Sequence, residues 1–148
     1  MELRQTKIEG VVELFPKVHG DDRGFFMEVW RDEVYRQVGI DVSFVQDNVS
    51  YSQKGVLRGL HFQHPHSQGK LVTVLAGEVF DVALDIRVGS PTFGQWEAVT
   101  LCGRKKNQIW VPPGFAHGFC VTSEEAYFHY KCSDRYFPES EGTVAWDD

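Results

Sequence analysis

The chain alternates short apolar runs with polar turns, and most of these runs have the two-residue periodicity of β-strands. Residues 79–87 (VFDVALDIR) are the clearest case, because apolar and polar residues alternate through them. Short apolar runs bounded by Gly, Pro or polar clusters are typical of strands. The pattern predicts strands at residues 11–15, 25–30, 44–49, 56–62, 71–76, 79–87, 96–101, 108–111, 115–121 and 126–132.

Two further local patterns complete the expected fold. Residues 76–78 (Ala-Gly-Glu) predict a tight hairpin turn, because glycine tolerates positive φ. Residues 31–38 predict one short helix, with Tyr35 and Val38 on its apolar face and Gly39 at its end. Strands at intervals of roughly 8–12 residues favour an all-β sandwich or barrel. We expect a single jelly-roll domain over residues 1–148 with one or two short helices, a fold that surrounds a small-molecule site with inward side chains.

Composition and charge narrow the function classes. A length of 148 residues with 42% hydrophobic content fits one domain with one core. The net charge of −6, without a run of Lys or Arg, argues against a nucleic-acid partner, which needs a basic surface. A single charged small molecule needs only a few local cations, so a ligand of that kind stays open.

Cysteine use and the apolar stretches bear on localisation. Cys102, Cys120 and Cys132 form no CxxC pair and are odd in number, which argues against a disulfide framework or a zinc site. Reduced thiols in a cytoplasm are the simplest interpretation. No apolar stretch approaches ~20 residues, and the first ten residues lack a signal-peptide core. We expect no membrane span and no export by that route.

The stretch Arg58-Gly59-Leu60-His61 places reactive groups inside an apolar strand. Strict alternation cannot turn Arg58 and His61 to the same side, but a bulge at Gly59 can aim both at one cavity. Arg58 suits a phosphate or carboxylate, and His61 suits proton transfer near neutral pH. A structural histidine beside a surface arginine explains the same residues, and both interpretations stay open at this point.

Three other residues interrupt apolar segments in a similar way. Lys70 begins a strongly apolar strand, where it either reaches solvent or stabilises a developing negative charge. His117 follows a Pro-Pro-Gly turn, which predicts a place at the mouth of a barrel. Tyr130 is either a packing residue or a proton donor whose ring is buried and whose hydroxyl reaches solvent.

The histidines also raise the question of a metal. His61, His64 and His66 followed by His117 resemble a jelly-roll metal site, but the carboxylate expected between them is missing. Lys70 stands in that neighbourhood, and a cation beside a divalent metal is repelled. We therefore expect no metal site, although an iron-dependent oxygenase of the same fold remains the competing class.

Many spaced motifs together resemble one known family, the dTDP-4-dehydrorhamnose 3,5-epimerases, almost from end to end of the chain. The motifs that carry the resemblance are FPKV at 15–18, GDDRGFFME at 20–28, FVQDN at 44–48, VLRGLHFQ at 56–63, QGKLV at 68–72, GEVFDVA at 77–83, DIR at 85–87, SPTFG at 90–94, PGFAHGF at 113–119 and Tyr130-Lys131.

The resemblance implies a cupin jelly roll (a double-stranded β-helix) that works without a cofactor or metal. It implies a homodimer whose N-terminal strands pack across the interface. The implied substrate is a dTDP-linked 4-keto-6-deoxyglucose, inverted at C3 and C5 to give the precursor of L-rhamnose. That activity belongs to cytoplasmic deoxysugar biosynthesis, as for cell-wall or lipopolysaccharide sugars.

The resemblance also assigns roles by position. His61 matches the proton acceptor, Tyr130 the proton donor, and Lys70 a group near the reacting C4 oxygen. The positions that match substrate contacts are Arg23, Phe26, Glu28, Gln46, Asn48, Arg58, His117, Tyr136 and Glu141, with Tyr136 as the ring that stacks near the thymine.

The sequence departs from the family pattern in two places. Family members usually continue for roughly another thirty residues past the position of Asp148, with a late Asp that partners the catalytic histidine. Asp81 and Asp85, on one face of the predicted strand 79–87, are candidates to replace that Asp. Asp134-Arg135 before Tyr136 is a charged pair that can alter base preference. Epimerisation of both carbons, epimerisation of one carbon, and sugar-nucleotide binding without turnover all remain open.

Overall fold

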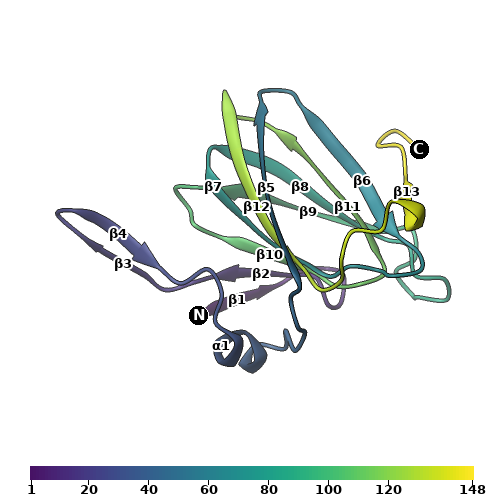
Figure 1. The fold of residues 1–148 in the computed structure, drawn as a ribbon, viewed down its shortest axis with the longest axis horizontal. Coiled ribbons are helices and arrows are strands. Elements are labelled where there is room, and N and C mark those ends of the chain that lie inside the picture. Colours follow the sequence, from purple (N-terminus) through teal and green to yellow (C-terminus); the bar gives the residue numbers. More distant parts are fainter.

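The computed structural model describes residues 1–148 as two facing antiparallel β-sheets, with a two-stranded arm that projects from one side (Figure 1). The six-stranded sheet has the order β1-β2-β10-β7-β12-β5, and the five-stranded sheet has the order β13-β6-β11-β8-β9. The elements are β1 Glu2–Gln5, β2 Val12–Phe15, β3 Val18–Asp21, β4 Gly24–Met27, α1 Asp32–Gln37, β5 Gln46–Gln53, β6 Leu57–Gln63, β7 Lys70–Ala76, β8 Glu78–Asp85, β9 Trp96–Cys102, β10 Gln108–Val111, β11 Phe115–Val121, β12 Glu125–Cys132, a 3₁₀ turn at Pro138–Ser140, and β13 Glu141–Thr143.

The predicted all-β jelly roll is confirmed, and the predicted strands all exist, with ends shifted by a few residues at most. The run predicted at 25–30 ends early, because β4 stops at Met27. Three strands were not predicted: β1, β3 and β13. They are short, and β3 is exposed along its whole length, so they lack the apolar alternation that identifies a half-buried strand.

The main core lies between the two sheets. In β8 the inward residues alternate with outward ones, so Val79 and Ala83 are fully buried. They belong to a cluster of 15 buried apolar residues, which β7, β9, β11 and β12 also supply. A second cluster of six lies on the outer face of the six-stranded sheet.

The helix α1 covers that second cluster. It spans six residues, from Asp32 to Gln37, within the predicted 31–38, and Gly39 follows it with φ of +94°. Tyr35 is fully buried, and its hydroxyl donates a hydrogen bond to Gln108 Oε1 at 2.7 Å. This helix is too short and too polar to cross a membrane, and it is the only α-helix of the chain.

The turn at residues 76–78 corrects one prediction. Gly77 has φ of +86° as expected, but β7 and β8 belong to different sheets and do not pair with each other. The turn is therefore a crossover and not a hairpin. The turn packs against β12 so closely that a Cβ on Gly77 would collide with the backbone of Glu125 and Ala126, and this position therefore requires glycine.

Candidate active site

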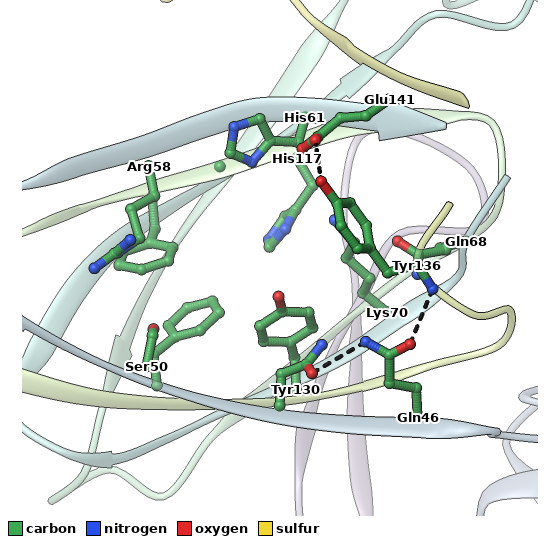
Figure 2. A pocket seen from close by; sticks show the side chains of 14 residues that line it. Gln46, Ser50, Arg58, His61, Gln68, Lys70, His117, Tyr130, Tyr136 and Glu141 are labelled. Atoms are coloured by element: carbon green, nitrogen blue, oxygen red, sulfur yellow. Dashed lines mark hydrogen bonds between the residues drawn. The ribbon is translucent and has the colours of Figure 1, made fainter. Parts of the chain in front are cut away.

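A cavity of about 340 Å³ opens between the two sheets, where their inward side chains change from apolar to polar (Figure 2). Its walls come from β5, β7 and β12 of one sheet and from β6, β11 and β13 of the other. The lining residues are Gln46, Asn48, Ser50, Arg58, His61, Gln68, Lys70, His117, Gly118, Phe119, Phe128, Tyr130, Tyr136 and Glu141.

A local irregularity between β6 and β11 turns two reactive side chains into this cavity. His61 pairs with His117 and Arg58 pairs with Phe119, so two residues of β6 stand opposite Gly118 alone. A Cβ on Gly59, whose φ is +124°, would come within 2.5 Å of the Gly118 Cα. The predicted bulge is therefore present, and both Arg58 and His61 line the cavity.

His61 is half-buried, and its imidazole makes no hydrogen bond within the protein. Burial lowers its pKa below the ordinary histidine value, and the nearby cations Lys70 and Arg58 lower it further. Glu141 is the group that opposes this shift. At neutral pH the imidazole is therefore neutral, which is the form that accepts a proton.

Tyr130 stands on the opposite wall, on β12, and its hydroxyl points into the cavity across from His61 (Figure 2). Burial raises the pKa of this phenol, so it stays protonated and able to donate. A neutral base and a protonated acid thus face one another from two different sheets.

Lys70, on the strand β7 that pairs with β12, brings its amino group into the cavity beside Tyr130. Burial lowers the pKa of its ammonium group. It makes no ion pair within the protein, and its Nζ lies 5.7 Å from the centre of the Tyr130 ring. Cys132, its strand neighbour, is fully buried, and burial raises the pKa of that thiol to about 11, so it is no nucleophile. An unpaired ammonium in a cavity is placed to stabilise a negative oxygen on a ligand.

His117 lies deeper than predicted. It is 5% exposed and belongs to the buried wall, not to the mouth. Its Nε2 lies 2.8 and 3.0 Å from the two carboxylate oxygens of Asp81, so it donates to that buried carboxylate. The other ring nitrogen, Nδ1, has no partner within the protein.

The prediction that Asp81 and Asp85 share one sheet face is confirmed, since both are fully buried. Neither supports His61, so that suggestion is wrong. Asp81 is occupied by His117, and Asp85 accepts hydrogen bonds from Arg87, Ser90 and Thr92. These donors hold the pKa of Asp85 well below its usual range, and the carboxylate fixes the loop after β8.

A polar network forms the rim near β5 and β13. The Tyr136 hydroxyl donates to Glu141 at 2.7 Å, and the Tyr136 backbone N–H donates to Gln46 Oε1 at 2.9 Å. Gln46 in turn donates to Asn48 at 3.1 Å. Four of the residues predicted to contact substrate therefore gather at one side of the cavity.

Three predicted substrate contacts lie elsewhere. Arg23, Phe26 and Glu28 belong to the β3–β4 arm and the segment after it, and none of them lines the cavity. Arg23 pairs instead with Asp21, and Glu28 with Arg31. None of the three residues is part of the cavity wall of its own chain.

The structure adds lining residues that the sequence did not single out. Ser50 and Gln68 are polar, and Phe119 and Phe128 form a stacked pair with ring centroids 3.9 Å apart. The signal for Ser50 was present, because residues 46, 48, 50 and 52 are all polar at the spacing of one strand face.

The histidines do not collect at one point. His66 stacks on Phe137 at 4.1 Å between ring centroids and lies 3.5 Å from Asp134, outside the cavity. No cluster of three or more His, Cys, Asp or Glu side chains has metal-binding geometry.

Comparisons with known proteins agree with this geometry. Residues 5–148 match the sequence profile of the family described as dTDP-4-dehydrorhamnose 3,5-epimerase. A curated protein of that name from Shigella flexneri is 54% identical over 150 residues, which cover 100% of this chain and 83% of the relative. One from Neisseria gonorrhoeae is 52% identical, and this chain spans 45% of its length.

Solved structures give the same answer for the fold. An epimerase from Legionella pneumophila, in complex with dTDP-4-keto-L-rhamnose, superposes with a TM-score of 0.96 at 57% identity and covers 98% of this chain and 78% of that one. An epimerase from Bacillus anthracis, with TDP and pyrophosphate bound, has a TM-score of 0.96 at 42% identity and covers 99% of this chain and 85% of that one. The chain therefore belongs to the dTDP-4-dehydrorhamnose 3,5-epimerase family of cupin-fold proteins.

Proposed function

We propose that this protein epimerises dTDP-4-dehydro-6-deoxy-D-glucose at C3 and C5 and forms dTDP-4-dehydro-L-rhamnose. The single cupin domain is the catalytic unit. The observation that carries the proposal is the placement of His61 and Tyr130 on opposite walls of one cavity, with the unpaired Lys70 beside Tyr130. The activity of its relatives, which are dTDP-4-dehydrorhamnose 3,5-epimerases, supports it.

The reaction begins with proton abstraction. The C4 ketone acidifies the protons on C3 and C5, and the neutral His61 accepts one of them. The electron pair of the C–H bond moves into an enolate, whose charge lies mainly on O4. The lowered pKa of His61 keeps it in the accepting form at neutral pH.

The enolate oxygen needs a positive partner that is already in place. The Lys70 amino group lines the cavity and forms no ion pair within the protein, so an ammonium here is available to O4. His117 supports the same region, because Asp81 fixes its ring orientation from behind. Neither group has to reorganise when the charge develops.

The reaction ends with a proton from the other side. The Tyr130 hydroxyl returns a proton to the carbon from the face opposite His61, and this inverts the centre. The phenolate recovers its proton from water, and the imidazolium loses its proton to water. Two such rounds, one at C3 and one at C5, complete the conversion without oxidation or reduction.

The nucleotide part is held by the polar rim. Tyr136 presents a half-exposed ring for the thymine, next to Gln46 and Asn48. The Arg58 guanidinium offers its fork of donors to the diphosphate.

Glu141 is the carboxylate that acts on His61 within residues 1–148. Thr143 on β13 pairs with His61 on β6, which puts Glu141 one diagonal position away, on the same wall of the cavity. The other charged groups that act on His61 are Lys70, His117 and Arg58, and each of them lowers its pKa. Glu141 thus stabilises the imidazolium that forms when His61 takes the proton.

A second copy of the chain completes the site. The β3–β4 arm projects from the body with Phe25 and Phe26 exposed (Figure 1). The outer face of the six-stranded sheet also exposes apolar residues, at Val49, Tyr51 and Tyr127. In a homodimer the arm covers the partner's apolar face, and Arg23, Phe26 and Glu28 reach the partner's cavity.

We place the protein in the cytoplasm, with a sugar nucleotide as its partner and neither nucleic acid nor membrane. The three cysteines are free, which fits a reducing compartment. The net charge of −6 does not favour a polynucleotide.

The first prediction tests proton abstraction. In D₂O with the ketosugar, wild-type protein will place deuterium at C3 and C5 as followed by NMR. The His61→Ala variant will lose exchange and turnover by roughly 10²–10⁴-fold, because no other group on that wall accepts the proton. Wild-type protein that binds dTDP without exchange would instead be a binding protein, and exchange at one carbon only would make it a single-carbon epimerase.

The second prediction concerns Glu141. The rate falls in acid as His61 becomes protonated, so removal of a charge that raises its pKa moves the acid limb of kcat/KM to lower pH. Glu141→Gln will show this displacement in a pH–rate profile, whereas Glu141→Asp will retain most of the wild-type profile. An acid limb at the same pH in Glu141→Gln would show that Glu141 does not act on the base.

The third prediction tests the dimer. His61→Ala and Arg23→Ala will each be inactive or weak alone, but co-expression will recover up to about a quarter of wild-type activity. The reason is that each mixed dimer contains one site with both native residues, if the arm acts on the partner's cavity. No recovery in mixed dimers verified by sedimentation and mass spectrometry would place Arg23 in its own subunit's site.

A further inference from the structure

The Ser50 hydroxyl oxygen is the one side-chain polar atom of the cavity wall that has almost no solvent exposure and no hydrogen-bond partner. Three buried side-chain atoms in the chain lack a hydrogen bond: Glu13 Oε2, Ser50 Oγ and His129 Nδ1. Glu13 has Arg4 as an ion-pair partner, and His129 lies outside the cavity lining. Ser50 alone faces the cavity. Buried polar groups are almost always hydrogen-bonded, so the unpaired Ser50 hydroxyl is available to a ligand in the cavity.

The neighbours of Ser50 on the same strand face all make side-chain hydrogen bonds within the protein. Gln46 and Asn48 bond to each other, and the Ser52 hydroxyl accepts a hydrogen bond from Arg58 Nε at 3.0 Å. These side chains follow one another at about 7 Å along β5. Ser50 lies between Asn48 and Ser52, and the wall beyond it is the Phe119–Phe128 ring pair, which offers no strong acceptor.

Arg58 is oriented toward the same place. Ser52 holds its Nε, and the Tyr51 carbonyl lies 3.5 Å from Nη2, so most of the guanidinium fork is left for a ligand. Ser50 lies on the same side of the cavity as Arg58, away from the Tyr136 end (Figure 2). A hydroxyl beside a guanidinium is an arrangement that suits a phosphate oxygen.

We propose that Ser50 donates its hydroxyl hydrogen to a phosphate oxygen of the substrate's diphosphate, while Ser52 fixes Arg58 for the same group. This deepens the proposed function and rests on it. The thymine and the diphosphate then lie along β5, from Tyr136 to Arg58, and the sugar points inward to His61 and Tyr130. Ser50 is a binding residue that takes no part in proton transfer.

The test uses Ser50→Ala and Ser52→Ala as a matched pair in the full chain. Ser50→Ala will not lower Tm, because its hydroxyl has no partner in the free protein, but it will weaken dTDP binding roughly tenfold in calorimetry. It will raise KM and leave kcat nearly unchanged, since the contact is the same in ground and transition states. Ser52→Ala will lower Tm and weaken dTDP binding as well, because it releases Arg58.

Thymidine, which lacks phosphate, serves as the second probe. Its affinity, measured by competition with dTDP, will be the same in Ser50→Ala and the wild type. Wild-type binding of dTDP together with unchanged dTDP affinity in Ser50→Ala would overturn this proposal alone. An equal loss for thymidine and dTDP would also overturn it, because Ser50 would then contact the nucleoside. A wild-type protein that binds no dTDP would contradict the proposed function itself.

Discussion

The close approach of β6 and β11 at Gly59 and Gly118 is the constraint on which the rest of the site depends. Any side chain on Gly59 would collide with the backbone of β11, and one on Gly118 would come within 2.7 Å of the Arg58 carbonyl oxygen. Because the strands meet here without side chains, the register shifts and both Arg58 and His61 turn inward. The same contact sets His61 opposite His117.

The cavity contains polar and charged groups that have no partner within the protein. Lys70 is buried without a counter-ion, and Ser50 is buried without an acceptor. Such groups destabilise the free protein, and a ligand with an enolate oxygen and two phosphates satisfies them both. Burial also keeps His61 neutral and Tyr130 protonated, so the same burial that makes the site costly also prepares its acid and its base.

The sequence predicted what local pattern determines and failed where distant pairing decides. Strands such as β10 and β11 were found to the residue, because their apolar runs are bounded by Pro, Gly or polar residues. The pattern at 76–78 predicts a hairpin wrongly, since a tight turn has the same local sequence whether it joins paired strands or crosses between sheets. The motifs located His61, Lys70 and Tyr130, but the carboxylate beside each histidine depends on strand register, which no local pattern fixes.

The central claim is that base and acid act on opposite faces of one sugar ring, and the Tyr130→Phe variant tests it most directly. In this variant, with the ketosugar in D₂O, His61 still abstracts the proton from carbon, but reprotonation from the opposite face is lost. NMR will then show recovered substrate that carries deuterium with its original configuration and little inverted product. Inverted, deuterated product formed at the wild-type rate would contradict the account, because inversion would not need the hydroxyl of Tyr130.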